Sequence, residues 1–242
     1  MIRQLPKLSL PSYFKQGQAD VDSLGELPEV KIYDIITEST PLNSEGNTMQ
    51  LQLYQRDSDT NEGQRELHGR LVLTTKSMPD EQDLKFGFMF AEDAQNGVYD
   101  GLQVRIRRNA ANQTSSFRPM DITSTQRPNV FADKATFEQD KSHDWVILEE
   151  ESSVTCENVG QCEYSVVFMR NFQTGDEGHD IAIEKGEERS YALTGFYQAH
   201  ALSDQRLTHI GQSQEMFILM GASNFAASSL LAAASLIAFC SF

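Results

Sequence analysis

The amino-acid sequence predicts an all-β protein, an antiparallel β-sandwich that precedes a hydrophobic C-terminal segment. Through the middle of the chain, short apolar runs alternate with polar residues. This period of two is typical of half-buried strands. Turn-forming residues separate the runs, and no convincing amphipathic helix interrupts them. Short strands at close spacing indicate a sandwich or a barrel rather than alternating strands and helices.

The individual strands are expected where the alternation is clearest. Residues 102–107 alternate cleanly, whereas the runs at 86–90 and 164–169 are apolar at most positions. The further expected strands are 29–33, 50–54, 71–74, 145–148, 180–184 and 189–193. The side chains expected to point into an immunoglobulin-like sandwich core are Phe88, Val104, Ile147, Val167 and Ile181.

A chain of 242 residues accommodates one full-sized domain with tails. We expect residues 1–46 to form an irregular lead-in that contributes one edge strand. Residues 47–209 are expected to form the β-sandwich. Residues 210–242 are expected to form a juxtamembrane segment and a hydrophobic C-terminal helix or lipid-attachment signal.

The charge balance excludes one class of partner. Lys and Arg total 20 against 35 Asp and Glu, which gives a net charge of −15. Such a surface repels nucleic acid and anionic lipid, so we expect no nucleic-acid partner.

The C-terminal part of the chain predicts membrane attachment. No Asp, Glu, Lys or Arg follows Glu215, and the apolar run from Met216 to Phe242 exceeds the ~20 residues that a helix needs to cross a bilayer. The small residues Gly221, Ser223 and Asn224 resemble a GPI-attachment site before an apolar tail. A tail-anchored helix is the alternative. Either places the protein at the cell surface or on a secretory-pathway membrane, although no signal peptide is visible in this chain.

Two features fit an extracellular environment. Cys156 and Cys162 flank a stretch with the turn formers Asn158 and Gly160, so the chain can reverse and join the two sulfurs in a disulfide. Two free thiols are the alternative. Asn112 begins an Asn-Gln-Thr sequon and is a candidate glycosylation site.

Two motifs carry a resemblance to a known family. The late motif, residues 167–181, has a strand with Phe168 and Arg170, a Thr-Gly-Asp turn and a second strand. The early motif has a Gly-Phe strand at 86–90 and a turn that leads to Asp100. In this order they resemble a DOMON domain. From the residues alone, Arg170 is expected to pair with Asp176 or Asp180 and to latch a hairpin.

The resemblance implies two possible ligands. Some DOMON domains hold haem b between a Met and a His, and Met89, His209 and His200 are the candidates here. The position where the family has its Met is occupied by Gly97. DOMON domains also resemble sugar-binding sandwiches, for which Trp145, Tyr99 and Tyr197 are the candidate aromatic platforms.

Motifs for hydrolytic or metal-dependent catalysis are absent from the sequence, which contains no Gly-x-Ser-x-Gly and no His-Glu-x-x-His.

Two function classes remain. The first is a membrane-anchored extracellular domain that binds a sugar, haem or a partner without catalysis. The second is a haem-binding redox module that resembles the DOMON portion of ferric-chelate reductase-like proteins. The chain has a single long apolar segment rather than a multi-helix membrane domain, which favours the first class.

Overall fold

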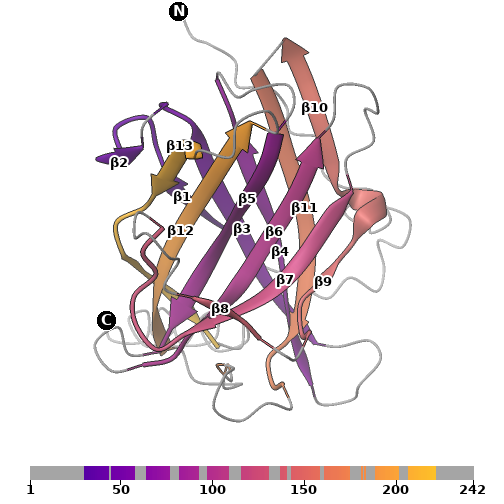
Figure 1. Ribbon diagram of the computed structural model, residues 1–242. Coiled ribbons are helices and arrows are strands. Elements are labelled where there is room, and N and C mark those ends of the chain that lie inside the picture. The colour runs from indigo at the N-terminus through magenta and orange to yellow at the C-terminus, as the bar shows by residue number, and fades with distance from the viewer. Residues whose placement is uncertain are drawn as a thin grey trace, which may run out of the picture.

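The computed structural model contains two antiparallel β-sheets packed face to face, so the predicted all-β sandwich is confirmed. Figure 1 shows β12, β5, β6 and β7 in one layer and β3, β4 and β11 in the layer behind it. The structure describes residues 30–43, 45–57, 64–76, 82–92, 97–108, 116–130, 137–140, 143–158, 161–174, 181, 183, 189–201 and 207–221.

The first sheet has the strand order β1-β3-β4-β11-β10, with β9 also paired to β11. Its strands are β1 (Lys31–Ile36), β3 (Thr48–Asp57), β4 (Arg65–Thr74), β9 (Val146–Ile147), β10 (Ser153–Asn158) and β11 (Gln161–Asn171). A 3-10 turn, η1 (Glu149–Glu151), connects β9 to β10.

The second sheet has the order β2-β13-β12-β5-β6-β7-β8, with β14 also paired to β12. Its strands are β2 (Leu42–Asn43), β5 (Gln82–Ala91), β6 (Tyr99–Arg108), β7 (Phe117–Ser124), β8 (Glu138–Gln139), β12 (Arg189–Ala201), β13 (Leu207–Gln212) and β14 (Met216–Met220).

Aromatic side chains fill the centre between the sheets. The Phe88 ring of β5 lies 5.4 Å from the Phe168 ring of β11, and the Trp145 ring lies 5.5 Å from both. Phe88 and Val104 are buried as expected, and Ile147 is partly buried against the core. Tilted and edge-on ring contacts of this kind add to the free energy gained from burying apolar area.

One side-chain direction in β11 differs from the sequence-based prediction. Val167 is buried, but it pairs with Arg70 on the outer face of the first sheet, while its neighbour Phe168 points into the core. Successive side chains in a strand point to opposite faces. The run at 164–169 is apolar on both faces, so its sequence pattern could not determine which face is inside.

The sheets extend beyond both ends of the expected sandwich range, 47–209. β1 pairs with β3 and is the edge strand expected at 29–33, with its bounds shifted to 31–36. β14 pairs with the first half of β12. The expected strand 145–148 is reduced to the two residues of β9. In the expected strand 180–184, Ile181 and Ile183 are described; both are buried, and neither belongs to a strand.

The start of the apolar C-terminal run belongs to the sandwich. Ile218 and Met220 of β14 are buried, and their strand pairs with β12. Residues 222–242, where the sequence predicts a hydrophobic helix, lie outside the described residues. Among those that are described, no helix is long and apolar enough to span a membrane.

The predicted disulfide is confirmed. Cys156 of β10 and Cys162 of β11 are direct partners in the antiparallel register, with their Cα atoms 4.1 Å apart, and their sulfurs are bonded. The hairpin that the bond closes is formed by β10 and β11. The expected strand at 145–148 precedes β10 and is not an arm of this hairpin.

Reduction of the disulfide is expected to lower the free energy of unfolding by about 2 kcal/mol, because so short a loop has little closure entropy to lose. Urea unfolding can be followed with and without reductant through the fluorescence of Trp145, the only tryptophan. A Cys156→Ser, Cys162→Ser double variant is the control and should not respond to reductant. Equal stability of the oxidised and reduced protein would contradict the prediction.

Candidate functional site

A buried ion pair joins the two sheets near the end at which β11 finishes. Arg170 of β11 points into the core, as Phe168 does, and Asp100 of β6 faces it from the second sheet. The exposed fractions of the two side chains are 0% and 1%. A charge this deeply buried needs a partner and hydrogen bonds, because desolvating an unpaired ion costs several kcal/mol.

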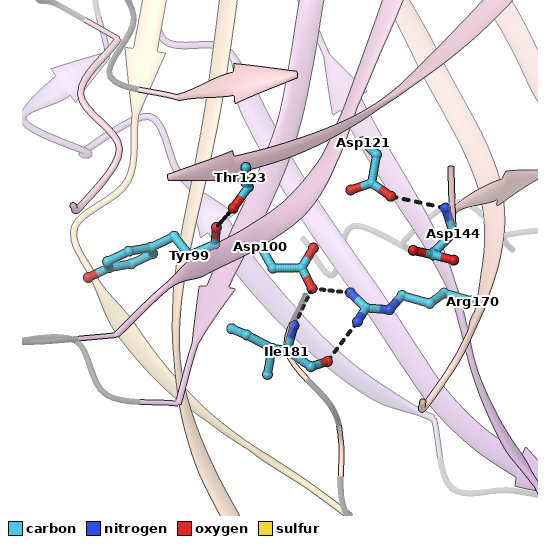
Figure 2. Close-up of polar contacts among 7 residues, drawn as sticks. All are labelled: Tyr99, Asp100, Asp121, Thr123, Asp144, Arg170 and Ile181. Atoms are coloured by element: carbon cyan, nitrogen blue, oxygen red, sulfur yellow. Dashed lines mark hydrogen bonds and ion pairs between the residues drawn. The ribbon is translucent and has the colours of Figure 1, made fainter. Parts of the chain in front are cut away.

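The pair forms a closed set of hydrogen bonds with Ile181 (Figure 2). Arg170 Nη1 donates to Asp100 Oδ2, and Arg170 Nη2 donates to the carbonyl oxygen of Ile181 at 2.6 Å. The Ile181 N–H donates to Asp100 Oδ2 at 2.9 Å. These bonds fix the backbone at Ile181 to both sheets.

Aromatic rings enclose the guanidinium. The Cζ atom of Arg170 lies 5.1 Å from the centre of the Trp145 ring and 5.5 Å from that of Phe90. A desolvated guanidinium against aromatic rings gains a favourable cation–π interaction. The rings also exclude water, so the ion pair cannot reach a dissolved ligand.

Further carboxylates lie beside the pair. Asp121 of β7 accepts the N–H of Asp144 at 3.0 Å, as Figure 2 shows. Burial raises the pKa of Asp100, and the negative charge of Asp140 raises it further. Arg170 and the Ile181 N–H act in the opposite direction. Asp100 Oδ1 has no hydrogen-bond partner among the described residues. Asp100 is therefore a carboxyl group whose charge depends on Arg170.

An open polar groove lies at the other end of the first sheet, beside the disulfide. Its volume is about 360 Å³, within the range of small-molecule sites. Six of its seven described lining residues carry a hydroxyl, amide or carboxylate side chain, and the seventh is Cys162. The six are Thr74, Thr75, Thr155, Glu157, Gln161 and Glu163. The Thr75 hydroxyl donates to the Cys162 carbonyl oxygen at 3.1 Å and accepts its N–H at 3.0 Å, which holds the floor of the groove in place.

The structure does not bring the haem candidates together. Met89 is fully buried in β5 opposite Thr194 of β12, whereas His209 of β13 lies opposite Ala199 of β12. Positions 194 and 199 are five positions apart, an odd number, so their partners lie on opposite faces of the sheet. His200 is placed opposite Asp83 in the register. Met89 and His209 cannot ligate one haem in this arrangement.

The aromatic candidates for a sugar platform are also unavailable. Trp145, Tyr99 and Tyr197 are 3%, 1% and 0% exposed, so none presents a ring face to a ligand.

Several other candidates lie outside the described residues. They are the glycosylation candidate Asn112, the lipid-attachment candidates Ser223 and Asn224, and the expected partners of Arg170, Asp176 and Asp180. Gly221 is described and directly follows β14.

No protein-family model matches the chain, and a search of characterised proteins found no match. In the part of the chain that the structure covers, no group of three or more His, Cys, Asp or Glu side chains converges as metal ligands would.

The sequence identified both members of the ion pair but did not pair them. Asp100 belongs to the early motif and Arg170 to the late one, and each interrupts a run that otherwise builds a buried strand. The pairing could have been predicted from one acidic and one basic residue in core strands, because buried charges are almost always paired.

Replacing Arg170 by Met should lower the free energy of unfolding by about 3–5 kcal/mol at pH 7, because the Asp100 carboxylate stays buried without its cation. Burial then holds the folded-state pKa of Asp100 above its unfolded value. The folded state therefore binds the proton more tightly. The loss of unfolding free energy relative to the wild type should therefore be small near pH 4. It should grow as the pH rises through the folded-state pKa of Asp100.

The matched control is the double variant Arg170→Met, Asp100→Asn, which removes both charges and keeps an acceptor for the Ile181 N–H. It should be more stable than the single variant at pH 7, and its loss of stability relative to the wild type should change less with pH than that of the single variant. Urea unfolding of all three proteins at pH 4.5 and 7, monitored by Trp145 fluorescence, measures this. A single-variant deficit that is the same at both pH values would show that Asp100 is not the group responsible.

Proposed function

We propose that this protein is a membrane-anchored extracellular domain of the DOMON kind, with an immunoglobulin-like sandwich, that binds a hydroxylated ligand such as a sugar without catalysis. The polar groove beside the disulfide is the observation that carries the proposal. It is open to solvent, whereas the charged cluster around Arg170 is enclosed.

The chemistry of the groove suits a sugar hydroxyl better than an apolar ligand. Five of the lining residues are exposed and supply donors and acceptors at the ends of three neighbouring strands, β4, β11 and β10. They are Thr74, Thr155, Glu157, Gln161 and Glu163. None of the described lining residues is aromatic, so affinity would come from hydrogen bonds rather than from stacking. Modest affinity is therefore expected.

The hydrogen bonds of the Thr75 hydroxyl, at the floor of the groove, favour a binding role over a catalytic one. A serine or threonine nucleophile needs a general base within hydrogen-bond reach. The Thr75 hydroxyl is instead bonded to the Cys162 backbone through both its donor and its acceptor. The Thr75 hydroxyl therefore holds the backbone of Cys162 in place rather than acting as a nucleophile.

Two features support the extracellular assignment. A disulfide persists in secretory and extracellular compartments and is rare in the reducing cytosol. The apolar run that follows β14 supports attachment to a membrane.

Titration of the ¹⁵N-labelled protein with neutral disaccharides (maltose, cellobiose, lactose and sucrose) should shift backbone amide signals at the ends of β4, β10 and β11. Gln161→Ala should weaken binding by roughly two- to twelvefold, since one hydrogen bond contributes about 0.5–1.5 kcal/mol. The matched control is Gln139→Ala, because Gln139 is equally an exposed strand residue but lies in the other sheet. Equal effects of the two variants, or shifts outside the groove, would reject the groove as the binding site.

Expression in a eukaryotic secretory host tests the anchor. The protein should remain with membranes after alkaline carbonate extraction, because an integral lipid or helix anchor resists it. Phosphatidylinositol-specific phospholipase should then release a GPI-linked form, attached near Gly221, Ser223 or Asn224, and leave a tail-anchored helix in place. Recovery of the protein in the carbonate-soluble fraction would refute membrane anchoring.

A further inference from the structure

Exposed apolar side chains gather where β1 begins and β14 ends. Val30, Ile32, Phe217 and Leu219 are 37%, 58%, 67% and 46% exposed. We call these four residues the exit edge, because the chain leaves the sandwich beside them. They are four of the six large hydrophobic side chains that are exposed among the described residues.

The exit edge is continuous across both sheets. The Lys31 ammonium of β1 donates to the Leu219 carbonyl oxygen of β14 at 3.4 Å, so the two edge strands lie beside each other. Ile32 pairs with Gln52 on the outer face of the first sheet. Phe217 pairs with Ala192 on the outer face of the second sheet. Apolar side chains therefore flank the same edge of the sandwich from both sides.

The point at which the chain leaves this edge is fixed. The N–H of Gly221 donates to Gln55 Oε1 of β3 at 3.1 Å, and its φ of 99° is accessible to glycine but not to most residues. An apolar run begins at Phe225. Four residues of extended chain span at most about 14 Å. No long linker separates the exit edge from the apolar run.

We propose that the exit edge rests on the surface of a zwitterionic lipid bilayer, so that the domain has a defined orientation on its membrane. This inference depends on the membrane anchoring proposed above and holds for both kinds of anchor. A lipid attached at residues 221–224 and a helix that begins at 225 each keep β14 within about 14 Å of the lipid. The net charge of −15 selects against an anionic surface.

The same orientation directs the polar groove away from the membrane. The groove lies at Thr74, and Gln55, which holds Gly221, pairs with Leu67. Leu67 precedes Thr74 by seven residues along β4, which is roughly 23 Å at about 3.3 Å per residue. A soluble ligand would therefore approach the groove from the aqueous side.

Lipid contact can be measured residue by residue on the full chain in phosphatidylcholine vesicles. In a Cys240→Ser background, single cysteines at positions 32 and 217 carry the polarity-sensitive fluorophore nitrobenzoxadiazole. Leu42→Cys and Val146→Cys are the matched controls. Both native residues are 48% exposed; Leu42 lies on β2 near the other end of the same edge, and Val146 lies on the opposite edge of the first sheet.

Emission from positions 32 and 217 should shift to the blue on vesicle binding and be quenched by phosphatidylcholine brominated in the upper acyl chain, because interfacial apolar side chains reach the headgroup and acyl boundary. Positions 42 and 146 should change little. A far-ultraviolet circular dichroism spectrum identical to that of the unlabelled protein would verify that each labelled protein is folded.

Three results would overturn the proposal. If the chain floats with vesicles but quenching is equal at all four positions or absent at 32 and 217, the anchor stands and the orientation fails. A blue shift that brominated lipid does not quench would mean that a second copy or the chain's own tail covers the edge. A chain that does not float with vesicles would refute the anchor and this orientation together.

Discussion

The buried contact between Arg170 and Asp100 is the constraint around which one end of the sandwich is organised. It is the point where a charged group from each sheet meets in the core, and its third member is the backbone of Ile181. Removing either partner leaves an ion without solvation, so the two sheets and the segment at Ile181 depend on one another. The Trp145 and Phe90 rings complete the enclosure by filling the space around the guanidinium.

The charged groups that stabilise the sandwich lie far from the groups proposed to bind a ligand. The groups with the most unusual electrostatics are sealed inside, where they specify how the sheets meet. The groups that can reach a ligand lie at the opposite end of the first sheet, on strand ends held by a disulfide and by the Thr75 hydroxyl. If the groove binds a ligand as proposed, its position on rigid strand ends would lower the entropic cost of binding. The exit edge occupies yet another surface, so the proposed anchoring and the proposed binding would not compete.

Much of the strand architecture could be predicted because alternation is a local signal. The regular pattern at 102–107 correctly predicts β6, and the turn formers between Cys156 and Cys162 correctly predict a bonded hairpin. The pattern fails where both faces of a strand are covered. In β11 the neighbours Val167 and Phe168 are both apolar and both buried, so the register with β4 alone decides which of them enters the core. The apolar residues of β14 were read as membrane anchor for the same reason, since burial in a sheet and burial in lipid select similar side chains.

The sequence by itself determined the strand-rich class, the disulfide partners and the acidic surface, because each depends on composition or on residues close together in the chain. The tertiary structure alone decided that Asp100 and Arg170 meet, that Met89 and His209 face opposite sides of a sheet, and that Trp145 is enclosed. These facts depend on strand order and register between segments far apart in the chain. A period-two pattern records which residues share a face of their own strand, and it contains no information about which other strand lies opposite.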